Sequence, residues 1–181
     1  MTTSQQLDAA ARRLAKVLKR RQLRIVLAES CTGGLISAVL AKIPGISELH
    51  CGSAVVYRLG TKQEWLGISA AVLKKPGPVS RLVAAEMAER ILKRTPEADI
   101  AASVTGHLGP GAPKRQDGLI YVGIAQHTNS GQTIAAKVKR HLLPGDQSVS
   151  LSHIDAGRLR VARQRAAAEF VLQQVINQFN Q

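Results

Sequence analysis

Short apolar runs alternate with amphipathic segments along this chain, and this alternation limits the fold more than any other feature. The run LRIVLA at 23–28 is short, apolar and rich in β-branched residues, which is typical of a strand buried on both faces of a sheet. A turn and a segment of helical period follow it, and the same order recurs further along the chain. Strands interleaved with helices predict an α/β fold, a three-layer α/β/α sandwich with a mixed, mostly parallel sheet.

The individual elements follow from periodicity and from turn residues. We expect helices over 5–21, 35–43, 61–68, 69–75, 79–94 and 155–178, and strands over 23–28, 53–57, 98–104, 119–126 and 133–143. The last two strands would form a late antiparallel hairpin around a turn at 127–132. The first helix should bury Leu7, Ala10, Ala11, Leu14 and Leu18, and the helix over 79–94 should bury Leu82, Ala85, Met87, Ala88, Ile91 and Leu92. No repeat or linker is evident, so we expect a single domain over 1–181.

Composition places the chain among globular proteins. Its 181 residues are 45% hydrophobic and 20% charged, and no apolar run approaches the roughly 20 residues that a membrane-spanning helix needs. The N-terminus lacks the layout of a signal peptide. Cys31 and Cys51 form neither a metal-ligand spacing nor a disulfide framework. We therefore expect a cytoplasmic protein that makes no membrane contact.

The net charge is the extreme value of the composition. It is +13, from 25 Lys and Arg against 12 Asp and Glu, and such an excess attracts partners that carry phosphate. Aromatic residues make up only 3% of the chain, and the basic residues are spread over several segments rather than gathered in a known module. Specific nucleic-acid binding is therefore the less favoured interpretation, and a small anionic substrate is the more favoured one.

Three expected strands end in polar or glycine-rich loops. These are ESCTGG at 29–34, YRLGTK at 57–62 and TGHLGPGA at 105–112. In open α/β sheets, ligands bind beyond the carboxyl ends of the strands. If the three strands are parallel, their loops meet at one edge of the sheet and form a site there.

The first of these loops carries candidate nucleophiles. Ser30 would stand at a sharp strand-to-helix turn, near the positive end of the helix dipole. Backbone N–H groups of Thr32, Gly33 and Gly34 would lack intrahelical partners and could hold an oxyanion or a phosphate. The motif is neither a G-x-S-x-G elbow nor a Walker A loop. An ordinary helix cap by Ser30 or Thr32 explains the pattern about as well.

A nucleophilic serine needs a base. Of the five histidines, only His107 falls in a loop that would converge on Ser30. Lys62 is the other candidate, if burial lowers its pKa, and Tyr57 could relay or orient a proton. From the residues alone, an exposed surface lysine is the simpler interpretation of Lys62.

Several segments in order resemble one protein family. AESCTGGLISAVLAKIPG, VVYRLGTKQEWLGI, GPVSRLVAAEMAE, ADIAASVTGHLGPGAP and LPGD are similar to the C-terminal domain family of the competence/damage-inducible protein CinA. The resemblance extends from about Leu23 to Arg163. AESCTGG and the SVTG followed by a GP are specific to that family.

The resemblance implies a chemistry. Several members are nicotinamide-nucleotide amidohydrolases, which hydrolyse nicotinamide mononucleotide to nicotinate mononucleotide and ammonia with no metal and no cofactor. Matched motif to motif, the implied catalytic residues are Ser30 as nucleophile, Lys62 as base, Tyr57 as a proton-transfer aid, and Thr105. The substrate-binding residues would be Glu29, Cys31, Thr32, Gly33, Gly34, Gly106 and Gly109. We also expect a homo-oligomer.

The chain departs from the family pattern around these residues. Arg58 and Leu59 replace two small polar residues after the tyrosine, His107 and Leu108 stand in the TGIAGP-like segment, and Gln147 replaces an arginine after PGD. Gly118-Leu119-Ile120-Tyr121 replaces a V-G-T-V-like strand start. A non-catalytic or substrate-shifted nucleotide-binding paralogue is therefore the alternative hypothesis.

Overall fold

Five strands form one mixed sheet in the computed structural model, which describes residues 3–113, 115–127, 136–145 and 153–179. The strands are β1 (Ile25–Glu29), β2 (His50–Val55), β3 (Ile100–Gly106), β4 (Leu119–Gln126) and β5 (Lys137–Leu142), in the order β2-β1-β3-β4-β5. β1 pairs in parallel with β2 and with β3, whereas β4 is antiparallel to both β3 and β5. The predicted parallel core with a late antiparallel hairpin is confirmed.

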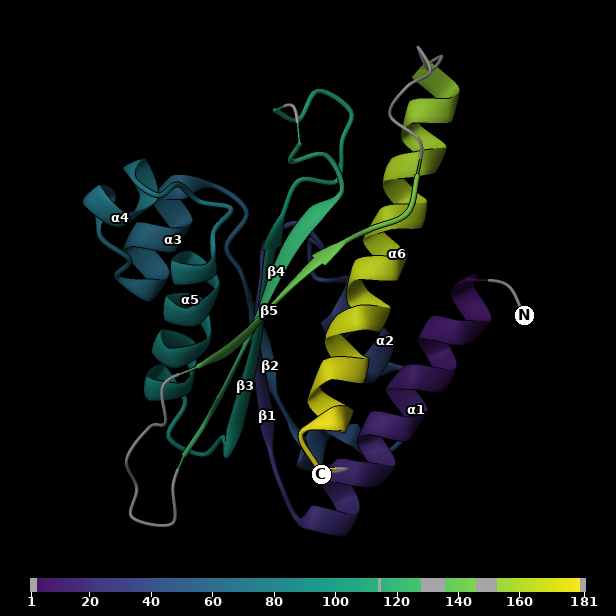
Figure 1. Ribbon diagram of the computed structural model, residues 1–181. Coiled ribbons are helices and arrows are strands. Elements are labelled where there is room, and N and C mark those ends of the chain that lie inside the picture. The colour runs from purple at the N-terminus through teal and green to yellow at the C-terminus, as the bar shows by residue number, and fades with distance from the viewer. Residues whose placement is uncertain (1–2, 114, 128–135, 146–152, 180–181) are drawn as a thin grey trace.

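Helices cover both faces of this sheet. They are α1 (Thr3–Arg21), α2 (Leu35–Ala41), α3 (Leu59–Leu66), α4 (Ala70–Lys74), α5 (Arg81–Arg94) and α6 (His153–Asn177), with a short 3₁₀ turn at Ile46–Glu48. Figure 1 shows α1, α2 and α6 on one side of the sheet and α3, α4 and α5 on the other. The three-layer α/β/α sandwich predicted from the alternating pattern is therefore confirmed.

Each face of the sheet has its own hydrophobic core. On the side of α1 and α6, Leu14, Leu18 and Leu172 pack with Ile100 of β3, all at 0% exposure. On the other side, the α5 residues pack against the opposite face of β1 and β3 and against α3. The buried face predicted for the first helix, Leu7 to Leu18, is confirmed.

The structure corrects the inward face of α5. Leu82 is 43% exposed and Ala85 is only half-buried, whereas Val83 and Ala84 are fully buried. The buried positions of this helix at 87, 88, 91 and 92 are preceded, one turn earlier, by buried positions at 83 and 84 rather than at 82 and 85. The prediction was wrong there because it followed the apolar character of Leu82 and Ala85, whereas the i, i+4 period of the helix places positions 83 and 84 on the buried face.

The second strand is also shifted relative to the prediction. It begins at His50 and ends at Val55, so that Tyr57 lies beyond it. α3 then starts at Leu59, where the backbone N–H of Arg58 donates to Thr61 Oγ1 at 3.2 Å. β5 is described from Lys137, and most of the turn predicted at 127–132 lies outside the described residues.

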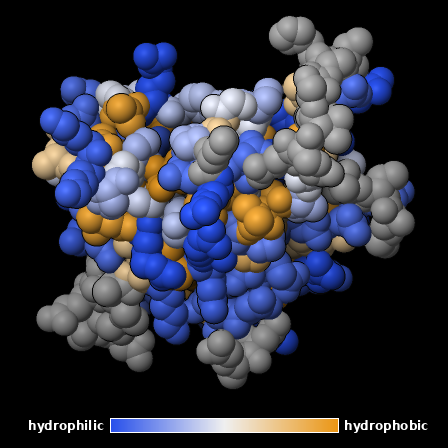
Figure 2. Space-filling model, turned by 45° about the horizontal axis from the view of Figure 1, so that its top comes forward, coloured by the Kyte–Doolittle hydropathy of each residue, from blue (hydrophilic) through white to orange (hydrophobic). Residues whose placement is uncertain are grey.

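The surface of the described part is mostly polar. Figure 2 shows hydrophilic side chains over most of one face, with hydrophobic residues in small separate groups. Within the described ranges, no helix has both the length and the apolar character needed to cross a bilayer.

Candidate active site

The carboxyl ends of β1, β2 and β3 open onto one pocket. The three strands are parallel to one another, so the loops that follow them meet at the edge that lies toward the top of Figure 1. This convergence was predicted from the sequence and is confirmed. The pocket has a volume of about 500 Å³. Its walls are formed by Ser30, Cys31, Tyr57, Arg58, Leu59, Gly60, Lys62, Pro78, Val79, Thr105, Gly106, His107, Leu108, Gly109, Pro110, Gly111, Ala112 and Arg160.

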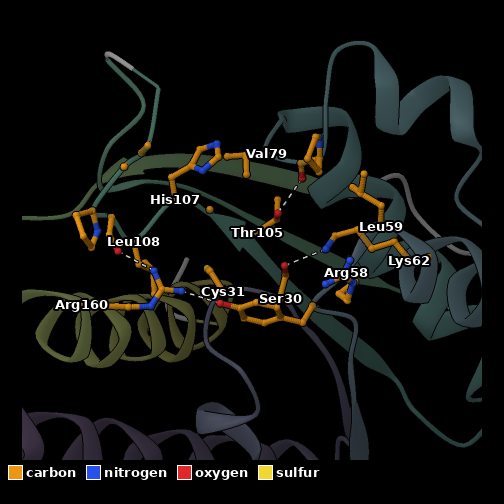
Figure 3. Close-up of a pocket in the computed structure, with 18 residues that line it drawn as sticks. Ser30, Cys31, Arg58, Leu59, Lys62, Val79, Thr105, His107, Leu108 and Arg160 are labelled. Atoms are coloured by element: carbon orange, nitrogen blue, oxygen red, sulfur yellow. Dashed lines mark hydrogen bonds between the residues drawn. The ribbon is translucent and has the colours of Figure 1, made fainter. Parts of the chain in front are cut away.

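Ser30 and Lys62 form a hydrogen-bonded pair in this pocket. Lys62 Nζ lies 2.9 Å from Ser30 Oγ (Figure 3). It also donates a second bond of 2.6 Å to the Val56 carbonyl. α3 supplies the lysine and the loop after β1 supplies the serine, and the carbonyl follows β2. A nucleophile and a base at this distance satisfy the geometric requirement for proton transfer.

Lys62 is buried, and its hydrogen bonds go to a hydroxyl and a carbonyl rather than to a carboxylate of the described residues. Lys62 is 2% exposed, and this burial lowers the pKa of its amine to about 8. Desolvation disfavours the ammonium form, which explains the direction of the shift. At neutral pH an appreciable fraction of the amine is therefore unprotonated and able to accept the Ser30 proton. His107 also lines the pocket, but the pair that the structure forms with Ser30 is made by Lys62.

The ESCTGG loop is fixed from within. The backbone N–H of Ser30 donates to the Val104 carbonyl at 3.0 Å and ties the turn to β3. The N–H of Gly33 donates to the Ser30 carbonyl, and the N–H of Gly34 donates to Glu29 Oε2. Both glycines have positive φ, at 62° and 94°, where a side chain would be strained. These two N–H groups are therefore engaged inside the loop rather than directed at the pocket.

Glu29 lies beneath the loop and caps α2. Its carboxylate accepts hydrogen bonds from the backbone N–H groups of Gly34, Ile36 and Ser37 and from the hydroxyls of Thr32 and Ser53, over 2.8–3.1 Å. Glu29 is 0% exposed, and neither it nor Thr32, Gly33 or Gly34 is among the described residues that line the pocket. The structure therefore gives these four residues, which the resemblance places at the substrate, a supporting position.

Cys31 lines the pocket next to Ser30 but is poorly suited to act as a thiolate. The side chain is buried, and desolvation raises the pKa of its thiol to about 12. Since the thiolate is the nucleophilic form of cysteine, this environment favours the hydroxyl of Ser30 as the attacking group.

Tyr57 stands at the mouth of the pocket and is 53% exposed. Its hydroxyl accepts a hydrogen bond of 2.6 Å from Arg160 Nη2 of α6. The other nitrogen of that guanidinium, Nη1, donates to the Gly109 carbonyl at 2.7 Å. Arg160 therefore joins the loop after β2 to the loop after β3.

Thr105 and Gly106 form the floor at the end of β3. Thr105 is buried, and its hydroxyl donates to the Pro78 carbonyl at 2.8 Å, which leaves its oxygen available as an acceptor. A Cβ on Gly106 would lie 2.5 Å from Ile120 Cγ2 and 2.8 Å from the Leu119 carbonyl oxygen. Only glycine fits at this position, because the backbone of β3 passes so close to β4.

Arg160 is the site residue that sequence reasoning missed. It lies 98 positions beyond Lys62 in a helix that contains several arginines, so no local signal separates it from a solvated charge. Its neighbour Gln164 donates to the Thr32 carbonyl at 2.7 Å and braces the nucleophile loop from the same helix. Across the described residues, no group of three or more His, Cys, Asp or Glu side chains is arranged to hold a metal ion.

The fold and the site define an α/β/α protein with a buried Ser–Lys pair at the carboxyl edge of its sheet. The family model of the CinA C-terminal domain matches residues 7–164, and the chain belongs to this family. It is 45% identical over 114 residues to a putative competence-damage inducible protein of Halothermothrix orenii, covering 62% of this chain and 27% of that protein. It is 37% identical over 143 residues to a CinA-like protein of Pseudothermotoga lettingae, covering 78% and 34%.

Solved structures agree with the fold. The competence damage-inducible protein A (ComA) of Klebsiella pneumoniae superposes with a TM-score of 0.80 at 24% identity, over 96% of this chain and 97% of that one. The competence/damage inducible protein CihA of Agrobacterium tumefaciens has a TM-score of 0.73 at 29% identity, over 95% and 96%. Our chain spans about a third or less of the length of the two curated relatives described above.

Proposed function

We propose that this domain is an amidohydrolase that cleaves the carboxamide of nicotinamide mononucleotide, with Ser30 as nucleophile and Lys62 as base. The observation that carries the proposal is the 2.9 Å contact between Lys62 Nζ and Ser30 Oγ inside a pocket. Burial supplies the second requirement, because it brings the amine to a pKa of about 8. The choice of substrate rests on the family, some members of which carry out this reaction.

The first half of the reaction forms an acyl-enzyme. Ser30 Oγ attacks the carboxamide carbon, and its proton passes to the neutral amine of Lys62. The carbon–nitrogen bond of the tetrahedral intermediate then breaks, and the Lys62 ammonium returns the proton to the departing nitrogen, which leaves as ammonia. We place the backbone N–H of Cys31 at the oxyanion, because Cys31 directly follows the nucleophile and lines the pocket. Thr32 is not among the described lining residues, and the N–H groups of Gly33 and Gly34 are bonded within the loop.

The second half hydrolyses the ester. Water attacks the acyl carbon while Lys62 accepts one of its protons, and Lys62 then protonates Ser30 Oγ as the carbon–oxygen bond breaks. The carboxylic acid that forms loses its remaining proton to solvent, and the product is the nicotinate carboxylate. Tyr57 lies at the entrance, where Arg160 holds its hydroxyl oxygen, so its own proton remains free to be donated.

Ammonia release from nicotinamide mononucleotide tests the proposal. Wild-type protein should release ammonia, and Ser30→Ala and Lys62→Met should each reduce the rate by at least about 10³-fold. Lys74→Met, which removes an exposed lysine of the neighbouring helix α4, is the matched control and should leave the rate unchanged. Equal rates for wild type and Ser30→Ala would contradict the mechanism.

A second candidate is a nucleotide-binding domain without turnover. Its support is the pair of bulky side chains, Arg58 and Leu59, that form part of the pocket wall. This alternative predicts a ligand-dependent rise in melting temperature across a panel of pyridine nucleotides, with no ammonia released from any amide among them.

A further inference from the structure

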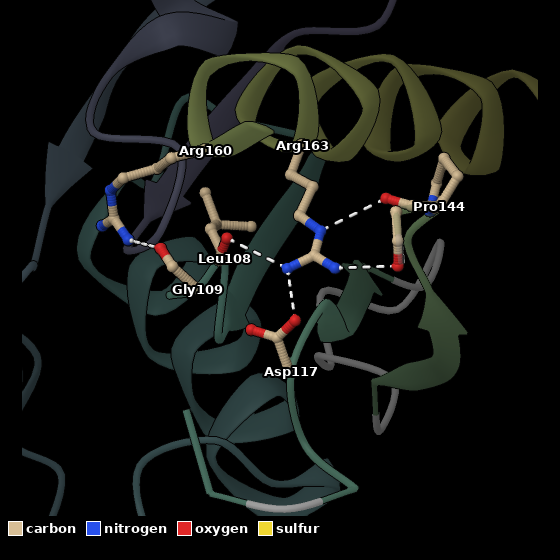
Figure 4. Close-up of polar contacts among 7 residues, drawn as sticks. Leu108, Gly109, Asp117, Pro144, Arg160 and Arg163 are labelled. Atoms are coloured by element: carbon tan, nitrogen blue, oxygen red, sulfur yellow. Dashed lines mark hydrogen bonds and ion pairs between the residues drawn. The ribbon is translucent and has the colours of Figure 1, made fainter. Parts of the chain in front are cut away.

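Arg160 places a positive charge at the pocket, and its observed hydrogen-bond acceptors are neutral. Its guanidinium donates to two neutral acceptors, the Gly109 carbonyl and the Tyr57 hydroxyl (Figures 3 and 4). Arg163, one turn further along α6, differs sharply, because its Nη1 lies 2.6 Å from a carboxylate oxygen of Asp117. Within the described ranges, the ion pairs include Arg163 but none that involves Arg160.

The rest of the pocket adds positive charge and supplies no balancing acid. Arg58 and Lys62 also line it, and the described lining residues include neither Asp nor Glu. Glu29, the carboxylate closest in sequence to Ser30, is buried beneath the loop with its oxygens bonded to α2 and to neighbouring hydroxyls. A half-enclosed pocket with cations and no carboxylate attracts a multiply charged anion.

The position of Arg160 also fits this role. The side chain is half-buried and crosses from α6 to the mouth, so that it lies at the side of the pocket away from α3 and its Lys62 (Figure 3). A guanidinium presents paired N–H groups that match the oxygens of a phosphate, and such charge-assisted bonds are stronger than bonds to a carbonyl or a phenol. An anion at the mouth would therefore compete effectively for the donors now held by Gly109 and Tyr57.

We propose that Arg160 is the specificity-determining residue of this pocket, and that it selects amides carrying a phosphate monoester over the same amides without one. This inference rests on the proposed function and assigns the phosphate to a side chain of α6. Bound phosphate takes N–H donors of Arg160, while the carboxamide lies at Ser30. The pocket then discriminates nucleotide from nucleoside through one ionic contact.

Binding in a chemically inactive background tests this assignment. The Ser30→Ala protein is titrated with nicotinamide mononucleotide and, separately, with nicotinamide riboside, and the dissociation constants are compared with those of Ser30→Ala/Arg160→Met. Loss of Arg160 should weaken nucleotide binding by about 10- to 100-fold and riboside binding by less than about threefold, because a charge-assisted pair is lost only for the phosphate. Arg160→Lys should retain part of the preference.

Arg158→Met is the matched control, since Arg158 is exposed on the same helix and lies outside the pocket lining. It should change neither constant, and all variants should keep the melting temperature of the parent. Equal weakening of both ligands on loss of Arg160 would assign it to holding Tyr57 and Gly109 in place and would overturn the proposal. No weakening, or no measurable binding of the nucleotide, would overturn it as well.

Turnover separates the two proposals. If wild type releases no ammonia but the nucleotide preference disappears with Arg160, the amidohydrolase function is wrong and the assignment of Arg160 holds. If wild type is active and Arg160→Met keeps the ratio of kcat/KM between nucleotide and riboside, the assignment of Arg160 is wrong and the function holds.

Discussion

Lys62 shows how one buried side chain sets the chemistry of the site. As an ammonium it donates to both Ser30 Oγ and the Val56 carbonyl. After losing a proton, the amine keeps a donor for the carbonyl and turns a lone pair toward the serine hydroxyl. The fold thus holds the base in place in both protonation states, while burial makes the neutral state accessible.

The pH dependence of turnover follows from this amine. Only neutral Lys62 accepts the Ser30 proton, so kcat/KM should rise about tenfold per pH unit below the pKa of about 8 and level off above it. Steady-state assays of ammonia release over this range give the profile. A rate that does not change across the pH range around 8 would contradict the assignment of Lys62 as the base.

Stability should depend on pH through the same group. The pKa of Lys62 is lower in the folded protein than its ordinary 10.5, so the unfolded chain binds more protons between about pH 8 and the unfolded value. Stability therefore rises with pH in this window and is lost as pH falls. Between about pH 7.5 and pH 9.5, the free energy of unfolding of wild type should increase by about 2 kcal/mol relative to Lys62→Met.

Urea denaturation at the two pH values measures this difference. Lys74→Met again serves as the control, because an exposed lysine should give a difference near zero. Parallel pH dependences for wild type and Lys62→Met would show that the folded protein does not lower the pKa of Lys62.

At the scale of elements, the turn from β1 into α2 depends on a carboxylate from within the strand. Gly34 is the N-cap of α2 and has no side chain to cap it. Glu29 of β1 fills that role, receiving three backbone N–H groups and two hydroxyls. The short helix therefore begins at a fixed place relative to the strand, and the Ser30 hydroxyl is fixed with it.

Glu29→Gln should weaken this element. In Gln one of the two accepting oxygens becomes an NH₂ group, which would face N–H and O–H donors and could not accept from them. The bonds to the remaining oxygen would also lose the assistance of the negative charge. We therefore expect the free energy of unfolding to fall by about 2–4 kcal/mol. Chemical denaturation measures the loss. Glu64→Gln, at an exposed position of α3, is the matched control and should change stability by less than about 0.5 kcal/mol.

Sequence patterns predicted most elements and failed where tertiary contacts decide. β4 was predicted at 119–126, as observed, because an unbroken apolar run is bounded by turn residues on both sides. The prediction that Leu82 of α5 is buried was wrong, since the i, i+4 period of the buried positions 84, 88 and 92 places Leu82 off the face that meets the sheet. Ser30 and Lys62 were predicted because loops of parallel strands converge and because the family motifs match. Arg160 was not, since its place depends on how α6 crosses the pocket.

At the scale of the whole molecule, Arg163 connects segments that are far apart in sequence. It pairs with Asp117 at 2.6 Å and donates to the carbonyls of Leu108, Pro144 and Gly145 at 3.2–3.3 Å (Figure 4). The side chain is 1% exposed. One buried cation thus joins α6 to the pocket loop after β3, the start of β4 and the segment after β5.

Arg163→Met should destabilise the whole fold. The substitution removes the guanidinium that pairs with Asp117 and donates to three carbonyls. Removing one partner of a buried ion pair typically lowers the free energy of unfolding by about 3–5 kcal/mol. Adding Asp117→Asn should recover part of this loss, because the remaining carboxylate is neutralised. Arg165→Met removes an exposed arginine of the same helix and should have little effect. Thermal and urea unfolding measure all four proteins, and equal stability of the Arg163 and Arg165 variants would contradict this account.

The central claim is that buried Lys62 activates Ser30, and a serine-directed fluorophosphonate tests it without reference to any substrate. Wild type should be labelled once, on Ser30, as located by peptide mass spectrometry, with a rate that rises with pH around the Lys62 pKa of about 8. Lys62→Met should be labelled at least about 100-fold more slowly, and Lys74→Met at the wild-type rate. Labelling of Ser30 at equal rates in wild type and Lys62→Met would contradict the account.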